Sequence, residues 1–234
     1  HVRGGAQAGR PIRNNETLNM TMKIRHLKPF DTTDLRAMEE AFAAIEPQPI
    51  ACCNWPDTYP YRPQVSFRIF HTGETLWLRF DVEERYTKGE VTEDNGRVWT
   101  DSCVEFFIAL DDTGYYNFET TCTGRLLLAF RKEREHPTHA TPELLARVGR
   151  YPSLGREPFA ERVGDNRWST VLAIPADVLF RHQLKRWNGV RATANLYKCG
   201  DELSHPHFLS WQPIENPKPD FHLPRFFAEV EFEQ

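Results

Sequence analysis

The sequence predicts an all-β fold, an antiparallel β-sandwich with one or two short peripheral helices. Many short segments alternate apolar with polar residues, turn-forming residues separate these segments, and helical spacing is found in only two places. Short strands joined by turns are typical of two sheets packed face to face. With 234 residues, 40% of them hydrophobic, the chain can bury a sizeable core. We expect a polar N-terminal tail at residues 1–21 and one β-sandwich domain at residues 22–234.

The beginning of this domain combines a strand, a helix and a loop. Residues 22–27 have a strand pattern, and residues 33–45 have the spacing of an amphipathic helix. The helix presents one apolar stripe, formed by Leu35, Met38, Phe42 and Ile45. Residues 47–63 are rich in Pro, Asn, Asp and Tyr without periodicity, which indicates an ordered loop.

Two hairpins follow. In the first, residues 65–82 alternate with period two on both sides of a turn at residues 71–74. The second joins residues 101–110 to residues 116–122 through a turn around Asp111.

The register of the second hairpin is restricted by side-chain parity. Its apolar residues share one face only if paired residue numbers have an even sum, as for Phe106 with Phe118 or Phe106 with Thr120. Glu105 and Glu119 then share the other face, either directly opposite each other or diagonally across the ladder.

The second half of the domain contains a charged insertion and further strands. Residues 131–165 are expected to form a surface excursion with one short helix, which begins at Thr141 and has Pro142 in its first turn. Its buried side would contain Leu144, Leu145 and Val148. Strand patterns resume at residues 168–174, 190–197, 208–211 and 226–232.

Charge and hydropathy exclude some partners. Lys and Arg total 29 against 33 acids, a formal charge of -4, so nothing favours binding to nucleic acid. No apolar run approaches the roughly 20 residues of a membrane-spanning helix. Because the chain begins without methionine, removal of a leader and translation from Met20 or Met22 both stay open. The favoured location is secreted or periplasmic, with the cytoplasm as the alternative.

The cysteine and histidine spacings do not predict a metal site or a disulfide framework. The five cysteines form no CxxC pair, so free thiols are expected, and Cys103 and Cys122 fall on opposite faces of the second hairpin. A metal site is the less favoured interpretation of the polar C-terminal cluster, formed by Asp201, Glu202, His205, His207 and His222.

Several segments resemble carbohydrate-binding module family 9. Residues 98–108 read VWTDSCVEFFI and residues 114–119 read GYYNFE. They are similar to the W-x-D-S-x-E-F-F-I strand and the following Y-Y-x-F strand of that family, with one additional residue between the serine and the glutamate. Residues 208–211, FLSW, and 219–227, PDFHLPRFF, resemble its closing strands and aromatic loop. The resemblance covers about residues 63–232, and the longer, uncharacterised bacterial branch of the family also has the additional segments.

The resemblance implies a jelly-roll-like sandwich that binds a saccharide or the end of a polysaccharide chain between two aromatic side chains. These positions correspond to Trp99 and to Phe221, where the family has a second tryptophan. The motif glutamate that hydrogen-bonds sugar hydroxyls corresponds to Glu105. An arginine on the next strand is replaced by Glu119, which exchanges a donor for an acceptor. Some members bind calcium, a candidate cofactor here, although no contiguous acidic loop identifies ligands.

The residues fit this expectation physically, and each also has a simpler interpretation. A pyranose needs flat aromatic surface and fixed polar groups, which Trp99, Glu105 and Phe221 supply. Alternatively, Trp99 caps the sandwich, Glu105 is a solvated acid, and Phe221 anchors a loop. The packing interpretation is favoured for Trp77, Trp168 and Trp211. Trp55, Tyr59 and Tyr61 have two open interpretations: they extend the binding surface, or they pack within their own loop and hold it in place.

Three functions therefore compete. Non-catalytic carbohydrate binding, in carbohydrate catabolism, is favoured by the resemblance. A glycoside hydrolase would use Glu105 and Glu119 as a carboxylate pair, in which mutual repulsion separates the acid and base roles. In a protein-interaction sandwich, the aromatic surface would bind a partner and no sugar.

Overall fold

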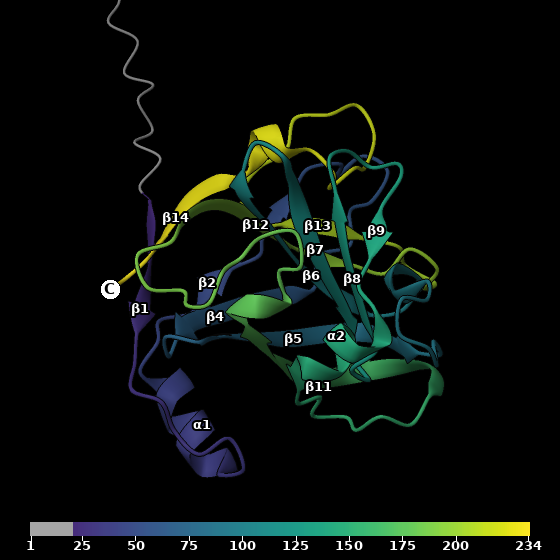
Figure 1. Cartoon of the computed structure of the whole chain (residues 1–234). Coiled ribbons are helices and arrows are strands. Elements are labelled where there is room, and N and C mark those ends of the chain that lie inside the picture. Colours follow the sequence, from purple (N-terminus) through teal and green to yellow (C-terminus); the bar gives the residue numbers. More distant parts are fainter. Residues whose placement is uncertain (1–20) are drawn as a thin grey trace, which may run out of the picture.

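The computed structural model describes residues 21–234, and two β-sheets packed face to face make up most of it (Figure 1). We name the sheets after their central strands. The β5 sheet contains β10 (Gly149–Arg150), β11 (Phe159–Pro175), β5 (Thr75–Gly89), β4 (Gln64–His71) and β2 (Gln48–Pro49). The β6 sheet contains β14 (Ala228–Phe232), β12 (Arg191–Cys199), β6 (Cys103–Asp111), β7 (Gly114–Thr121), β8 (Leu126–Arg131) and β9 (Thr138–His139), and β13 (Phe208–Ser210) and β3 (Cys52–Cys53) extend it from β12. The predicted antiparallel β-sandwich is confirmed.

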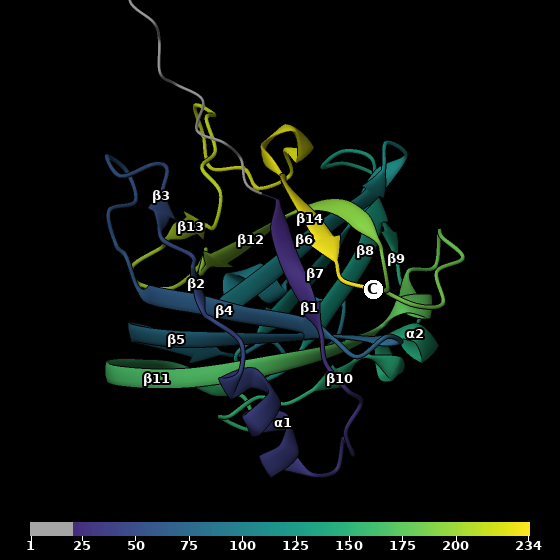
Figure 2. The same ribbon diagram turned by 90° about the vertical axis from the view of Figure 1, so that its left-hand side faces the viewer.

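Strand β1 (Met22–His26) connects the two sheets along one side (Figure 2). Its first residues pair with β14, and Arg25 and His26 pair with β4. Both pairings are parallel, whereas the other strand pairs of the described chain are antiparallel. A strand that changes sheets in this way closes one edge of a sandwich.

The main core lies between the sheets, because every second residue of each strand points inward. Phe67 and Phe80 of the β5 sheet belong to the same apolar cluster as Phe106, Phe118 and Leu128 of the β6 sheet, and all five side chains are at most 1% exposed. The predicted faces of both hairpins are therefore correct.

The second hairpin has the first of the two predicted registers. Phe106 pairs with Phe118, and Glu105 lies directly opposite Glu119. Cys103 and Cys122 belong to different clusters on opposite faces of the β6 sheet. All five cysteines are free, as expected.

Helix α1 (Leu35–Ala43) covers part of the outer face of the β5 sheet, below β4 and β5 in Figure 1. Asp34 caps it by accepting hydrogen bonds from two backbone amides of the first turn. Met38 and Phe42 are buried against Phe70 and Trp77. The predicted burial of Leu35 is wrong, because this residue opens the helix beyond the contact with the sheet and is 57% exposed.

The predicted surface excursion at residues 131–165 needs correction. Helix α2 (Pro142–Arg147) is capped by Thr141 as expected. However, Leu145 and Val148 enter the main core between the sheets. The segment therefore closes one end of the sandwich.

Several strands differ from the prediction: β5 continues to Gly89 rather than ending at residue 82, and the predicted loop at residues 47–63 contains the short strands β2 and β3. Strand β11 begins at Phe159 rather than at residue 168, and two register shifts in its first half disturb the alternation. Strand β8 was not predicted, because its run LLLAF is apolar on both faces and has no period of two. The predicted polar tail lies outside the described residues apart from Thr21. Within residues 21–234 no helix has the length and apolar character needed to cross a membrane.

Candidate functional site

The outer face of the β6 sheet carries a cavity of about 470 Å³. Its floor is formed by neighbouring strands, which contribute Glu105 from β6, Glu119 from β7, Leu127 from β8 and Cys199 from β12. These residues point outward because each is out of phase by one position with the inward-facing core residues of its strand. The cavity is thus built on a rigid sheet.

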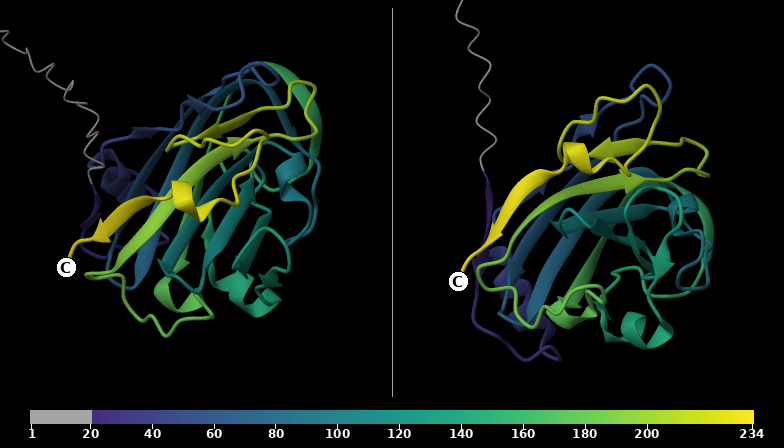
Figure 3. Two further views of the ribbon diagram at one scale, coloured as in Figure 1. Left: turned by 90° about the horizontal axis from the view of Figure 1, so that it is seen from above. Right: turned by 45° about the horizontal axis from the view of Figure 1, so that its top comes forward.

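Loops and the C-terminal segment form the walls of this cavity. In Figure 3, seen from above, the C-terminal segment passes over the strands of the β6 sheet. There, Phe221 stacks on Tyr197 with ring centroids 4.2 Å apart, and the Tyr197 hydroxyl donates a hydrogen bond to the carbonyl oxygen of Phe221. Phe221 is 8% exposed, so it lines the cavity while one of its ring faces is already covered.

Trp99 stands at the cavity on a short 3₁₀ helix, η1 (Val98–Thr100), which directly precedes β6. Its side chain is half-buried, and within the described chain no other aromatic ring stacks on it. Its carbonyl oxygen accepts a hydrogen bond from the amide of Asp201 at 3.0 Å. Trp99 therefore has a fixed backbone and an available ring surface.

The Asp and Ser of the motif hold this short helix in place. The Asp101 carboxylate accepts a hydrogen bond from the amide of Val91 at 2.8 Å, and the Ser102 hydroxyl accepts one from the amide of Lys88 at 3.0 Å. Both side chains are fully buried. These bonds attach the start of β6 to the end of β5, so the motif residues position Trp99 while contributing no surface to the cavity.

The floor carries acidic groups at high density. Glu105 and Glu119 are 3% and 4% exposed. Burial, and then the neighbouring carboxyl group of Glu119, raise the pKa of Glu105 well above its usual value. Burial, followed by the charge of Glu119, raises the pKa of Asp201 to about 6. The floor is therefore rich in groups that exchange between hydrogen-bond donor and acceptor.

Two arginine side chains in the wall of the cavity bring positive charge near its acidic floor. Arg131 at the end of β8 lines the cavity, and its Nε donates to the Asn117 side chain at 3.0 Å. The Asn117 amide in turn donates to Glu119 at 2.7 Å. Arg134, from the segment that follows, also lines the cavity. Acceptors and donors therefore face the same space.

The structure brings all four predicted site residues, Trp99, Glu105, Glu119 and Phe221, to this one cavity. Sequence reasoning missed further lining residues, among them Arg131, Arg134, His139, Asp201 and His222. The charge of the insertion was the only available signal for the first three, and it had indicated a surface excursion instead.

The polar C-terminal cluster does not form a metal site among the described residues, which agrees with the less favoured status of that interpretation, although Asp201 and His222 both line the cavity. His207 contacts the Lys198 ammonium at 2.7 Å, His205 stacks on Tyr86, and His222 contacts the Tyr115 hydroxyl. Trp55 is 8% exposed and donates a hydrogen bond to the carbonyl of Asn216, which supports the self-pinned loop. Trp77 and Trp168 are buried and Trp211 packs against the core, as predicted.

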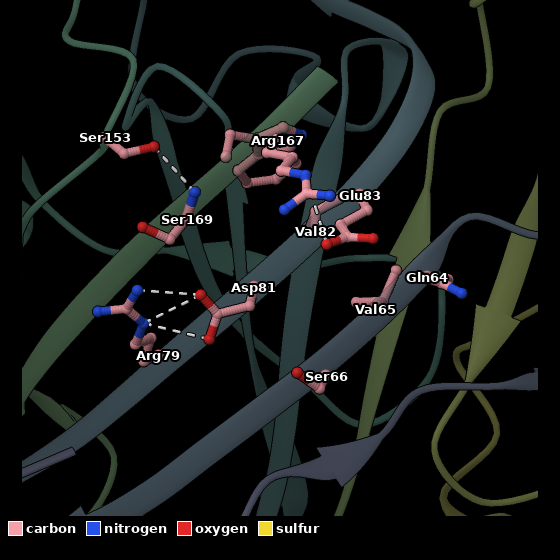
Figure 4. Close-up of a pocket in the computed structure, with 11 residues that line it drawn as sticks. Gln64, Val65, Ser66, Arg79, Asp81, Val82, Glu83, Ser153, Arg167 and Ser169 are labelled. Carbon is pink, nitrogen blue, oxygen red and sulfur yellow. Dashed lines mark hydrogen bonds and ion pairs between the residues drawn. The ribbon is translucent and has the colours of Figure 1, made fainter. Parts of the chain in front are cut away.

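A second hollow lies on the outer face of the β5 sheet, as Figure 4 shows. Its charged side chains are already paired, since Asp81 binds both Arg68 and Arg79, and Arg167 lies near Glu83. Trp168 borders it but is only 4% exposed. This hollow lacks an available aromatic surface, so the cavity on the β6 sheet is the better candidate site.

An aromatic wall above buried carboxyl groups, on one face of a β-sandwich, defines a small-ligand-binding module of the carbohydrate-binding type. A model of carbohydrate-binding family 9 matches residues 36–232. This match extends over most of the sequence, and the chain belongs to that family. The predicted family and the predicted carbohydrate-binding function are thereby confirmed.

Solved structures agree with this assignment. The chain is 41% identical to a Bacteroides uniformis protein proposed to bind carbohydrate, with a TM-score of 0.86, covering 91% of this chain and 99% of that one. It also resembles a family 9 carbohydrate-binding module from Caldicellulosiruptor kristjanssonii, solved in complex with glucose and with cellotriose. Both complexes have 10% identity, a TM-score of 0.53 and 92% coverage of this chain, with 96% and 94% of their own chains covered. This second likeness concerns the fold alone. No curated protein matches.

Proposed function

We propose that the cavity on the β6 sheet binds the end of a saccharide or polysaccharide chain without catalysis. The observation that carries this proposal is that the available ring of Trp99 and the carboxyl group of Glu105, on the outer face of the β6 sheet, border the same cavity. A sugar ring that stacks its C–H face on Trp99 would direct hydroxyl groups toward the floor. There, carboxyl oxygens accept hydrogen bonds from hydroxyl groups.

Arg131 and Arg134 extend this proposal to the donor side of the site. The family's arginine on the strand after the motif is replaced by Glu119, which leaves an acceptor in place of a donor. Arg131 comes from the next strand, β8, and is only 9% exposed. Its guanidinium group supplies fixed donors on the other side of Glu119. We therefore propose that Arg131 takes over the hydrogen bonding of the missing arginine, with a changed preference among sugars.

The geometry of the two acids favours binding over glycoside hydrolysis. A retaining hydrolase needs carboxyl groups about 5–5.5 Å apart, and an inverting hydrolase needs a larger separation. Glu105 and Glu119 lie opposite each other within hydrogen-bonding reach of one another. A glycosidic bond has no room between two groups that contact each other.

Titration calorimetry with glucose, cello-oligosaccharides, xylo-oligosaccharides and soluble plant polysaccharides tests the proposal. We expect at least one of these ligands to bind, and Trp99→Ala to lose at least about tenfold in affinity, or about 1.4 kcal/mol. Arg167→Ala, in the hollow on the opposite sheet, is the matched control and should bind like the unmodified chain. Absence of binding by every sugar, or equal binding by the Trp99 variant, would reject the proposal. Release of reducing sugar that disappears in Glu105→Gln would establish the hydrolase instead.

A further inference from the structure

Two cysteines and a glutamate meet at the floor of the cavity. Cys103 on β6 and Cys199 on β12 are directly opposite each other in adjacent antiparallel strands, and both point to the outer face. Glu105 lies on the same face of the sheet, two residues after Cys103 along β6. The three side chains are 0%, 1% and 3% exposed. Cys103 and Cys199 have no role in the sugar binding proposed above, whereas Glu105 would belong to both sites.

The distances in this cluster match those of a tetrahedral metal site. The Cys199 sulfur lies 3.5 Å and the Cys103 sulfur 3.9 Å from Oε1 of Glu105. All three ligand atoms lie within 4.8 Å of one another. With Zn–S bonds of about 2.3 Å and Zn–O bonds of about 2.0 Å, the ligand atoms around a tetrahedral zinc ion are about 3.5–3.8 Å apart. One ion could therefore contact all three atoms with small side-chain adjustments.

Within residues 21–234, no lysine or arginine forms an ion pair with Glu105. The lysine that precedes Cys199, Lys198, points to the opposite face of the strand, where its ammonium group binds Glu84 at 2.9 Å and His207 at 2.7 Å. A bound divalent cation would compensate three ionised ligands in this dry environment.

We propose that Cys103, Glu105 and Cys199 form a binding site for zinc or a similar thiophilic divalent metal at the floor of the cavity. Two sulfur ligands disfavour calcium and magnesium, which prefer oxygen ligands only. Glu105 and Cys199 both line the cavity, so the ion enters from there. Asp201 lines the same cavity and would be the candidate for the fourth coordination position.

Cobalt binding tests this proposal directly. The reduced, metal-free chain is titrated with Co²⁺, which gives a thiolate-to-cobalt charge-transfer band and the visible d–d bands of tetrahedral cobalt when two cysteines coordinate. We expect these bands to saturate at one ion per chain and to disappear when Zn²⁺ is added. Zinc bound to the isolated chain is then counted by elemental analysis.

Variants locate the ion. Cys103→Ser and Cys199→Ser should lose the charge-transfer band, and Glu105→Gln should weaken binding by at least about tenfold. Cys122→Ser is the matched control, since Cys122 is equally buried but lies on the inner face of the sheet. Thermal unfolding of each variant confirms that it is folded.

Three outcomes would overturn the proposal. They are absence of the band in the reduced unmodified chain, its persistence in both cysteine variants, and recovery of Cys103 and Cys199 as a disulfide in a chain isolated without reductant and without zinc. Because the titration measures metal alone, its failure leaves the proposed sugar binding intact. Conversely, a chain that binds cobalt but no sugar would retain only the metal site.

Discussion

The strands of both sheets alternate inward-facing and outward-facing residues, but the outer face of the β6 sheet is covered by other segments and much of the outer face of the β5 sheet is open to solvent. On the β6 sheet, the outward residues are covered by the C-terminal segment and by loops, and Phe107, Tyr115 and Tyr197 are completely buried there. On the β5 sheet, helix α1 covers one end, and the remainder stays open with its charges in exposed pairs around Asp81. One face has thus become a second core, and the other has remained a surface.

This difference determines what each face can do. The open face pairs opposite charges in contact with water, where such pairs contribute little and bind nothing further. The covered face keeps Glu105 and Glu119 opposite each other, with no ion pair to either from any residue between 21 and 234, in an environment that raises the pKa of Glu105. Polar groups in such an enclosed site are available for a ligand and interact strongly with it. The covered face is therefore the one equipped for recognition.

The largest loss of stability should come from removing a buried aromatic ring from the covered outer face of the β6 sheet. Phe107 is fully buried on the outer side of β6, and its ring lies 4.7 Å from Tyr197 and 4.9 Å from His222. Phe107→Ala should lower the free energy of unfolding by about 3–5 kcal/mol because it leaves a cavity in a packed cluster. Denaturant unfolding measures this value. A loss below about 1 kcal/mol would mean that the outer face of the β6 sheet is not a second core.

Much of this arrangement could be predicted from the sequence, because period-two alternation is a local property. It indicates both hairpins, and side-chain parity puts Glu105 and Glu119 on the same face of the second one, in one of two registers. Strand β8 was beyond this reasoning, since both of its faces are buried and its sequence has no alternation. The first half of β11 was missed because register shifts interrupt its pattern.

The site was less predictable than the fold. Trp99, Glu105, Glu119 and Phe221 were found through a family resemblance, and the geometry places all four at one cavity. Arg131 and Asp201 reach the same cavity because strands that are distant in sequence become neighbours in the sheet. The pairing of Cys103 with Cys199 across β6 and β12 has the same origin. Such neighbours leave no local signal in the sequence.

A smaller loss of unfolding free energy should follow from lowering the pH, because His222 on the covered face excludes a proton. Burial, and then the charges of Arg131 and Arg134, lower the pKa of His222 to about 3 in the folded chain, from an ordinary value of 6.5. Between these values the unfolded chain binds a proton that the folded chain excludes, so acidification favours unfolding. His222 should therefore contribute a loss of about 1–2 kcal/mol in unfolding free energy between pH 7 and pH 5.

Comparing the unmodified chain with His222→Gln isolates this contribution. Glutamine keeps a hydrogen-bonding group near the Tyr115 hydroxyl, which lies 2.9 Å from His222 Nδ1, but it cannot take up the proton. Denaturant unfolding at a series of pH values should show a shallower loss of stability for the variant below pH 6.5. Parallel curves would mean that His222 is accessible to protons in the folded state, and that the covered face is more open than its packing indicates.

The smallest effect should come from the open face. Asp81 accepts hydrogen bonds from Arg68 and Arg79, yet its side chain is 33% exposed and the arginines are 29% and 26% exposed. Asp81→Asn keeps the shape of the side chain and removes its charge, so it should cost less than about 1 kcal/mol in unfolding free energy. Most of this cost should vanish in 1 M salt, where the screening length falls to about 3 Å. The affinity for sugar should not change, because the residue lies on the opposite sheet from the cavity.

A loss of several kcal/mol in the unfolding free energy of Asp81→Asn that persists in high salt would show that the charge network around Asp81 is shielded from solvent. The contrast between the two faces would then rest on the aromatic residues alone.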